Sequence, residues 1–402
     1  MPVFNISLPE DKLIVYCART FLTLGDKEQA RVLLESDLNW SYLVKMAQLN
    51  GVTPLLYKNL HSLFRESVPQ AVLEHLWTQF QKNRLNNLLL GTELTRLVKI
   101  FSDNGIRAIP FKGPSLAISG YRDLSLRTFF DLDILVRRAD LSRAITLLIA
   151  RGYKAKGKQE PDEHHDHNDE RYHIFTRENG ILKVDLQESI AGSHFYFRID
   201  DKKLGNRLES LPLLGSSVPK LPVEEELFIL CIHGAKHLFE CLKWICDVAE
   251  MIRAHPEIDW DRVVKLAKTF RSERILHLGL FLAHTILDIG LPAALSRKIV
   301  NDTEVRFLAE YVQAKLLSGL NGAIVNVDRK IVFLRMRDRW WEKVRYWVFL
   351  CTTQNPSEKL PSGLPLPWLF FLFYQPILMT GKFLVRSKKT KRVIINWFEK
   401  IT

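Results

Sequence analysis

Cysteine is scarce in this sequence and shows no paired spacing. The 402-residue chain has five cysteines, an odd number, and no two of them form a CxxC pair or a zinc-finger pattern. They are Cys17, Cys231, Cys241, Cys246 and Cys351. We therefore expect no disulfides and no structural zinc site. Such cysteine usage is typical of a protein that works in a reducing compartment, and it predicts a cytoplasmic location.

A secretory signal and an uninterrupted membrane span are also missing from the pattern. The opening MPVFNISLPEDKLIV has no basic region followed by a long apolar run. Residues 360–381 have no charged side chain, but four prolines leave only a short uninterrupted helix there. We expect this segment to pack against helices of the same chain. Peripheral contact with a membrane stays open as the alternative, because the basic run RSKKTKR follows it.

Negative charge is in short supply toward the C-terminus. The chain has a formal net charge of +12, and residues 329–402 hold 15 Lys and Arg against 4 Asp and Glu. A block of this kind attracts RNA, DNA or an anionic membrane surface. It is equally a common way for a protein to stay in solution, and composition does not decide between these interpretations.

The periodicity of apolar residues divides the chain into four regions. Residues 1–104 show apolar positions recurring at three and four, which predicts a helical region. Residues 105–200 change to short apolar runs of strand length, and residues 201–350 return to helical spacing. The last region, residues 351–402, combines the proline-containing apolar stretch with the basic tail. We therefore expect an α+β fold with its strands between two helical regions.

The middle region predicts a small mixed sheet. IRAIPF is a strand-length run that leads through the glycine of KGPS into a short helix, and FFDLDILV is a second strand. Asn179-Gly180, between two extended segments, is a strong hairpin signal. Residues 156–171 are polar and without periodicity, which predicts a mobile loop. Three histidines lie there, at 164, 165 and 167, but nothing in the segment would fix their geometry for a metal.

The alternation of acidic and apolar residues in DLDILV is the sharpest chemical signal. Period two places Asp131 and Asp133 on the same face of a strand. Like charges this close are unfavourable unless a cation lies between them, and Mg²⁺ prefers carboxylate and phosphate oxygens. Asp185, in the second strand of the predicted hairpin, would complete a three-carboxylate site for nucleotidyl transfer if the two strands are neighbours. The alternative is that these are a turn acid, a solvated strand residue and an edge charge.

These segments together resemble a known family. FKGPSLAISGYRDLSLRTFFDLDILV looks like the signature of the uncharacterised bacterial nucleotidyltransferase family, of the polymerase-beta-like superfamily. ILKVDLQESI matches the position of that family's third carboxylate, and CIHGAKHLFECLKWICDVAEMI resembles its helical stretch. The resemblance covers roughly residues 88 to 255. One departure stands out, because Gln187 occupies a position where the family often has histidine, which puts any proton transfer there in doubt.

The resemblance implies a polymerase-beta-like palm that binds a nucleoside triphosphate with Mg²⁺ or Mn²⁺. Asp131, Asp133 and Asp185 would be the catalytic and metal-binding residues. A second set would contact or orient the nucleotide: Lys112, Gly113, Ser115, Arg127, Lys236 and Asp247. For Arg127 the open choice is between phosphate and an acidic side chain beside it. For the Lys112-Gly113 turn, the alternative is an ordinary connection from strand to helix.

We therefore expect an enzyme that moves a nucleoside monophosphate group from a triphosphate to an acceptor and releases pyrophosphate. The acceptor is open, with RNA, protein and small molecules as candidates. The main rival is a non-catalytic module that keeps the palm as a scaffold and binds nucleic acid or a membrane surface through the basic C-terminus. A toxin-like transferase that modifies tRNA or a protein is a third hypothesis.

Overall fold

The computed structural model describes residues 6, 8–155, 172–188, 207–316, 329–344 and 346. It divides the chain into two units, residues 1–325 and 326–402. The predicted loop at 156–171 with its three histidines, and the predicted C-terminal segment at 351–402, lie outside the described residues. Predictions about these segments stay predictions, as do the boundaries of the four predicted regions.

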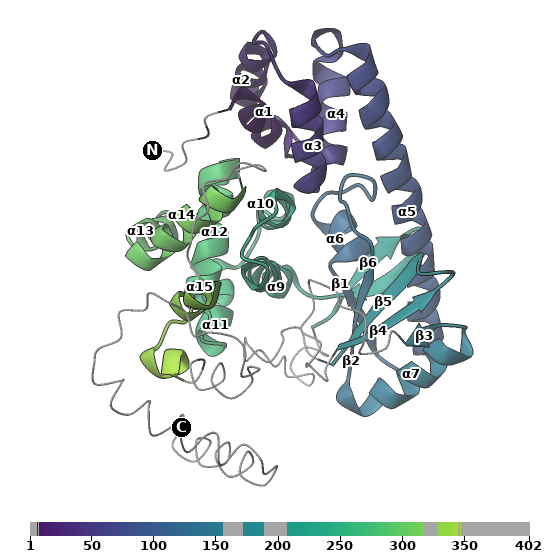
Figure 1. Ribbon diagram of the computed structural model, residues 1–402. Coiled ribbons are helices and arrows are strands. Elements are labelled where there is room, and N and C mark those ends of the chain that lie inside the picture. The colour runs from purple at the N-terminus through teal and green to yellow at the C-terminus, as the bar shows by residue number, and fades with distance from the viewer. Residues whose placement is uncertain are drawn as a thin grey trace, which may run out of the picture. The chain divides into compact units, whose positions relative to one another are not determined.

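The chain begins with a layer of helices, as the sequence predicts. Thr23 and Asp26 form a capping box at the start of the second helix, which satisfies backbone N–H groups there. The last helix, α5, is 34 residues long and runs from the N-terminal helices to the sheet (Figure 1). The elements are α1 (Pro9–Cys17), α2 (Leu24–Leu34), α3 (Trp40–Leu49), α4 (Thr53–Leu63), η1 (Arg65–Ser67) and α5 (Gln70–Asp103).

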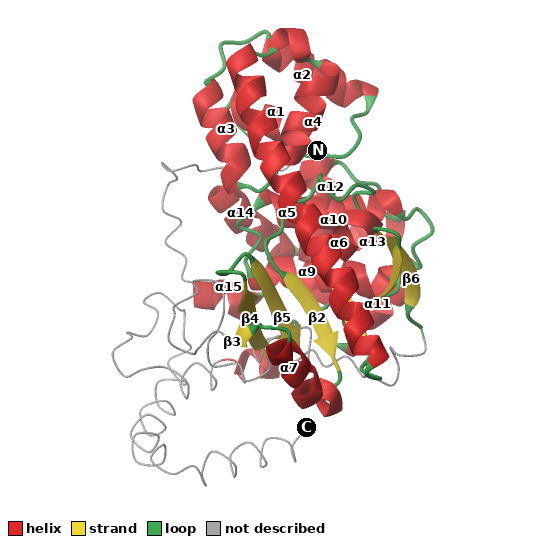
Figure 2. Ribbon diagram, turned by 90° about the vertical axis from the view of Figure 1, so that its right-hand side faces the viewer, coloured by secondary structure: helices red, strands yellow, loops and turns green. Residues whose placement is uncertain are grey.

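A five-stranded mixed sheet follows, which confirms the predicted α+β class. The strands are β1 (Ala108–Phe111), β2 (Leu132–Val136), β3 (Lys154–Ala155), β4 (Tyr172–Arg177) and β5 (Leu182–Gln187). Their order is β1-β2-β5-β4-β3, and Figure 2 shows β2, β5, β4 and β3 side by side. The β2 and β5 strands are parallel, and the other pairs are antiparallel. The predicted hairpin joins β4 to β5, with Asn179 and Gly180 at positive φ in its turn.

The two faces of the sheet differ in polarity because side chains alternate along each strand. Leu132, Ile134 and Val136 of β2 and Val184 and Leu186 of β5 belong to one buried apolar cluster. That cluster also includes residues of α5 and of α7 (Leu141–Ala150). Alternation directs the residues between them to the opposite face. The polar face of the sheet therefore presents the acids of β2 and β5.

A second, two-stranded sheet lies where the sequence predicts only helices. The strands β6 (Glu209–Leu213) and β7 (Ser216–Lys220) pair antiparallel, and their apolar residues join the cluster under the large sheet. Pro212 and Pro219 obscure the strand pattern, since proline removes a ladder donor and is confined to strand edges. The prediction of a purely helical region from residue 201 is therefore wrong for this hairpin.

Helices make up the rest of the described chain after this hairpin. The first two, α9 and α10, contact each other, and α12 packs on both. They are α9 (Val223–Lys236), α10 (Leu242–Ala254), α11 (Trp260–Thr269), α12 (Glu273–Leu287), α13 (Ala293–Val300), α14 (Thr303–Leu316) and, in the second unit, α15 (Arg329–Arg335). No helix in the described part of the chain is long and apolar enough to cross a membrane.

Candidate active site

A strained turn connects the first strand to the short helix α6 (Gly113–Ser119). Lys112 and Gly113 both have positive φ, at 56° and 43°. A Cβ atom on Gly113 would lie 3.3 Å from the carbonyl oxygen of Asp131, which is a tight contact. Glycine is needed there for both its backbone angle and its small size. The turn therefore packs closely against the backbone at the start of β2.

The predicted pair of neighbouring acids is present on the polar face of the sheet. Asp133 of β2 is the register partner of Asp185 of β5, and both are buried. One oxygen of Asp133, Oδ1, accepts hydrogen bonds from Lys112 Nζ at 3.0 Å and from Gln187 Nε2 at 2.8 Å. Gln187, the residue that departs from the family pattern, thus holds a carboxylate by donating a hydrogen bond, which requires no titration.

The surroundings of Asp133 favour its protonated form. Burial raises the pKa of Asp133 to about 6. The ammonium of Lys112 acts in the opposite direction, while the negative charges of Asp131 and Asp185 add to the increase. Burial is thus the main cause, and the two neighbouring acids act in the same direction. A cation bound beside Asp133 would favour its charged form.

Asp131 lies one residue before β2 and is partly exposed. Its carboxylate makes no hydrogen bond or ion pair with the described residues. Over the same residues, no group of three or more His, Cys, Asp or Glu side chains is arranged to hold a metal ion. Mg²⁺ in nucleotide sites is usually bound by one or two carboxylates together with substrate phosphates. The oxygen donors of Asp131 and Asp133 fit that requirement in number and type.

Arg127 and Asp247 are paired with each other and do not point to an open site. Arg127 Nε donates to Asp247 Oδ1 at 2.7 Å, and its NH2 nitrogen donates to Oδ2 at 2.8 Å. The hydroxyl of Tyr121 also donates to Asp247 Oδ1, at 2.7 Å. All three side chains are buried. Of the two alternatives for Arg127, the structure shows the acidic partner, and contact of Arg127 or Asp247 with a nucleotide stays a prediction.

This buried cluster connects two parts of the fold that are far apart in sequence. Tyr121 and Arg127 belong to the loop between α6 and β2, and Asp247 belongs to α10. Two hydrogen bonds from one planar guanidinium fix the relative orientation of both partners. The cluster therefore anchors the loop that leads to Asp131 onto the helical region.

An aromatic group formed by His233 of α9, His237 just after it and Trp244 of α10 lies near Lys112. The rings of His237 and Trp244 stack with centroids 4.8 Å apart, and His233 meets Trp244 edge-on at 5.9 Å. Burial lowers the pKa of His233 well below its usual value, and Lys112, His237, Lys236 and Arg127 add to this. His233 is thus a neutral imidazole surrounded by positive charge. Lys236, predicted to contact phosphate, is half-buried within this group.

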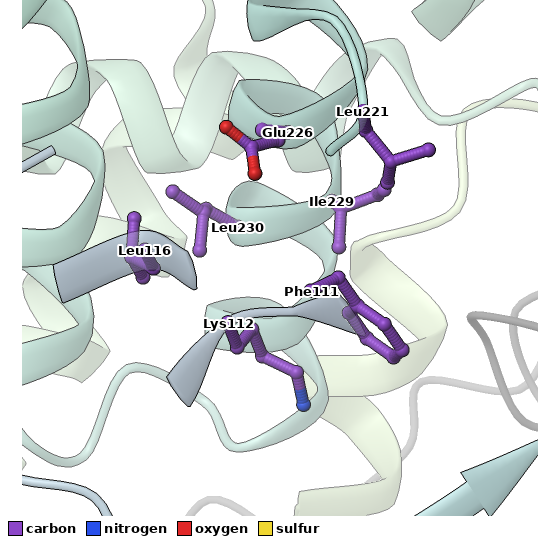
Figure 3. A pocket seen from close by; sticks show the side chains of 7 residues that line it. All are labelled: Phe111, Lys112, Leu116, Leu221, Glu226, Ile229 and Leu230. Carbon is purple, nitrogen blue, oxygen red and sulfur yellow. The ribbon is translucent and has the colours of Figure 1, made fainter. Parts of the chain in front are cut away.

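The pocket beside the Lys112-Gly113 turn is small. A pocket between the turn and α9 has room for about one water molecule. Figure 3 shows Lys112 there with its ammonium directed away from Glu226. The pocket is lined by Phe111, Lys112, Leu116, Leu221, Glu226, Ile229 and Leu230. It is too small for a nucleotide, so a ligand would bind on the other side of the turn, where the ammonium and the carboxylates lie.

Ser115, predicted to contact phosphate, is fully buried in α6, so a ligand in solution does not reach its hydroxyl unless α6 moves.

Lys243, in the first turn of α10, was not among the predicted site residues, yet Asp131 is among the charges that act on it. No local pattern marks this lysine, because only the fold brings it near an acid 112 positions earlier in the chain.

The comparison with known proteins agrees with this geometry. No curated protein matches the chain. The model of the uncharacterised nucleotidyltransferase family matches residues 36–288, which is more than half of the chain and includes the turn, the three acids and the α9–α10 aromatic group. The chain therefore belongs to the uncharacterised nucleotidyltransferase family.

Proposed function

We propose that the protein is a metal-dependent nucleotidyltransferase with a polymerase-beta-like palm, which moves a nucleoside monophosphate group from a triphosphate to an acceptor. The observation that supports this most is the pairing of Asp133 with Asp185 on adjacent parallel strands. Asp131 and the Lys112 ammonium lie beside them. Acids and a cation gathered on one polar face, in a family of nucleotidyltransferases, suit a phosphate-bearing substrate.

Asp131 and Asp133 would hold Mg²⁺ or Mn²⁺ together with the triphosphate, and Asp185 would assist on the acceptor side. The metal supplies charge neutralisation on the phosphate oxygens when it is bound. Gln187 keeps the carboxylate of Asp133 in place through its hydrogen bond to Oδ1. Lys112 donates to the same oxygen. When a metal ion neutralises Asp133, the Lys112 ammonium would be free to contact a phosphate.

The reaction forms a bond between the acceptor oxygen and the α-phosphorus. It breaks the bond between that phosphorus and the oxygen that bridges the α- and β-phosphates. Pyrophosphate leaves with the electron pair of the broken bond. The proton of the acceptor hydroxyl passes to Asp185 or to a solvent base, and the carboxylate of Asp185 beside Asp133 suits the first route. The protein's contribution is positioning and charge neutralisation, with no covalent intermediate.

The experiment that tests this is label transfer from each α-labelled nucleoside triphosphate with Mg²⁺. Total RNA, cell protein and small-molecule extracts are supplied separately as acceptors. We expect label in one acceptor fraction, and its loss in Asp133→Ala. Asp103→Asn, a change at an exposed acid of α5, is the matched control and should transfer as wild type does. Transfer that survives Asp133→Ala would contradict the site assignment.

One observation favours a second candidate function. Lys112 already forms an ion pair with Asp133 at 3.0 Å, and a protein that has given up catalysis could keep this pair as part of its scaffold. A non-catalytic module of this kind would bind nucleic acid or a membrane surface through basic residues. Its binding would weaken steeply with salt and survive Asp131→Asn. Catalytic turnover in the label-transfer experiment would exclude it.

A further inference from the structure

Lys243 is held in a fixed place by the N-terminal helical region. Its backbone N–H donates to the carbonyl of Asn50 at 3.1 Å, and the N–H of Leu242 donates to the Asn50 side chain at 3.0 Å. Its side chain lies along Gly51, because a Cβ atom on that glycine would be 3.2 Å from Lys243 Cδ and 3.6 Å from Cε. The turn at Asn50-Gly51 therefore directs the lysine stem.

The ammonium of Lys243 has no counterion of its own in the described structure. Burial lowers the pKa of Lys243, and the positive charge of Arg127 adds to this. Cys241, Asp247 and Asp131 act in the opposite direction, but Asp247 already holds Arg127 with both oxygens. The side chain forms no hydrogen bond or ion pair with any of the described residues. Burying an ammonium without a partner lowers the stability of the folded protein, and an anion bound beside it would offset that loss.

We propose that Lys243 binds a phosphate of the nucleoside triphosphate, as a second cation in addition to Lys112. This rests on the proposed function. Lys112 approaches the carboxylates from the turn after β1. Lys243 lies one helical turn before Asp247 on α10, and Asp247 holds Arg127 of the loop that leads to Asp131, so α10 faces this loop from the other side. A polyphosphate bound at Asp131 would then meet positive charge from both elements. The N-terminal helices thereby take part in substrate binding, since the Asn50-Gly51 turn positions this lysine.

The first test replaces the ammonium. Binding of each nucleoside triphosphate and of inorganic triphosphate, with Mg²⁺, is measured by calorimetry for the full chain and for Lys243→Met. We expect the variant to bind inorganic triphosphate and the preferred nucleotide roughly 10- to 100-fold more weakly, because a charge-assisted hydrogen bond is lost. Lys243→Arg should recover part of the affinity. Lys99→Met, at an exposed lysine of α5, should leave it unchanged.

The second test moves the lysine without removing it. Gly51→Ala would press against the Lys243 stem, and Gly105→Ala is a matched control. Both glycines have similar positive φ, 65° and 67°, so the backbone strain is comparable, but a Cβ atom on Gly105 meets nothing within 4 Å. We expect Gly51→Ala to bind triphosphate more weakly than Gly105→Ala does. Thermal unfolding of both variants shows how much of this difference follows from lost stability. Equal binding by the two variants would contradict the role of the Asn50-Gly51 turn.

The outcomes separate this inference from the proposed function. Unchanged binding in Lys243→Met, with normal label transfer, would overturn the role of Lys243 alone. Weakened binding in a protein that transfers no label would support Lys243 as an anion ligand and overturn the proposed reaction. A wild-type protein that binds neither nucleotide nor inorganic triphosphate would overturn both.

Discussion

Glu226 shows how burial at the start of α9 changes the chemistry of a single carboxylate. Burial raises its pKa to about 7, while Lys220 of β7 and Ser119 of α6 lower it and Glu209 of β6 adds to the increase. The lysine nitrogen lies 4.0 Å from Glu226 but 3.1 Å from Glu209, so its charge is shared. The folded state therefore favours the protonated form of Glu226 near neutral pH.

This gives a prediction for stability against pH. The folded pKa of Glu226 lies above the unfolded value, so its contribution to stability is complete below about pH 4.5 and is lost as pH rises through about 7. Glu226→Gln cannot ionise, and its free energy of unfolding relative to wild type should rise over that window by up to roughly 3 kcal/mol. Urea unfolding at pH 5 and pH 8 measures this. Glu66→Gln, at an exposed glutamate, should show no such trend, and an equal difference at both pH values for Glu226→Gln would refute the assignment.

For individual site residues, the sequence predicted positions that depend on a local pattern. The period-two alternation of DLDILV placed Asp131 and Asp133 on one face, with Asp185 beside them if its strand is a neighbour. The structure shows that the strands of Asp133 and Asp185 are neighbours, while Asp131 lies just before its strand. Roles that depend on contacts between distant segments could not be obtained in this way. Arg127 and Asp247 are 120 residues apart, and only the fold shows that they neutralise each other.

At the scale of elements, the Arg127–Asp247 pair fixes α10 to the loop before β2. Breaking one side leaves a buried charge without its partner, so Arg127→Met and Asp247→Asn should each reduce the free energy of unfolding by about 3–5 kcal/mol. The double variant should lose clearly less than the sum of the two. A double-mutant cycle by urea unfolding measures the coupling.

The exposed pair Arg31–Glu28 of α2 is the control for that cycle. Both side chains are more than half exposed, so its coupling should be about 0–1 kcal/mol. Additive losses at Arg127 and Asp247 would show that the two parts of the fold do not depend on this pair.

Gly234 is required by the packing between α9 and the chain that follows it. A Cβ atom there would lie 2.1 Å from the ring of Phe239, which is fully buried and cannot move away cheaply. We expect Gly234→Ala to lower the free energy of unfolding by about 1–3 kcal/mol or more, measured by urea denaturation. Gly25→Ala in α2 is the matched helical control, because its nearest neighbour would be 3.8 Å away, and it should be neutral or stabilising. Equal effects of the two substitutions would contradict this explanation.

Element prediction succeeded where one local signal dominated. Apolar periodicity located the helices, and Asn179-Gly180 located the β4–β5 hairpin. It failed at β6–β7, where two prolines mask alternation and the turn at Leu214-Gly215 uses positive φ for both residues. Leucine is uncommon in that conformation, so the sequence did not indicate a turn there.

For the whole molecule, the chain belongs to the uncharacterised nucleotidyltransferase family, and the proposed reaction rests on this match together with the paired acids of β2 and β5. The Asn50-Gly51 turn contacts Lys243 of α10, so the phosphate site that we propose would draw on the N-terminal helices, the sheet and α10.

Nucleotidyl transfer requires that the bond to the α-phosphorus is the one that reacts. Supplying the preferred nucleoside triphosphate labelled either on the α- or on the γ-phosphate, with Mg²⁺ and the responsive acceptor fraction, measures this. We predict that α-label enters the acceptor while γ-label leaves as pyrophosphate, and that both events stop in Asp133→Ala. Transfer of γ-label to the acceptor, or its release as orthophosphate, would contradict nucleotidyl transfer by this protein.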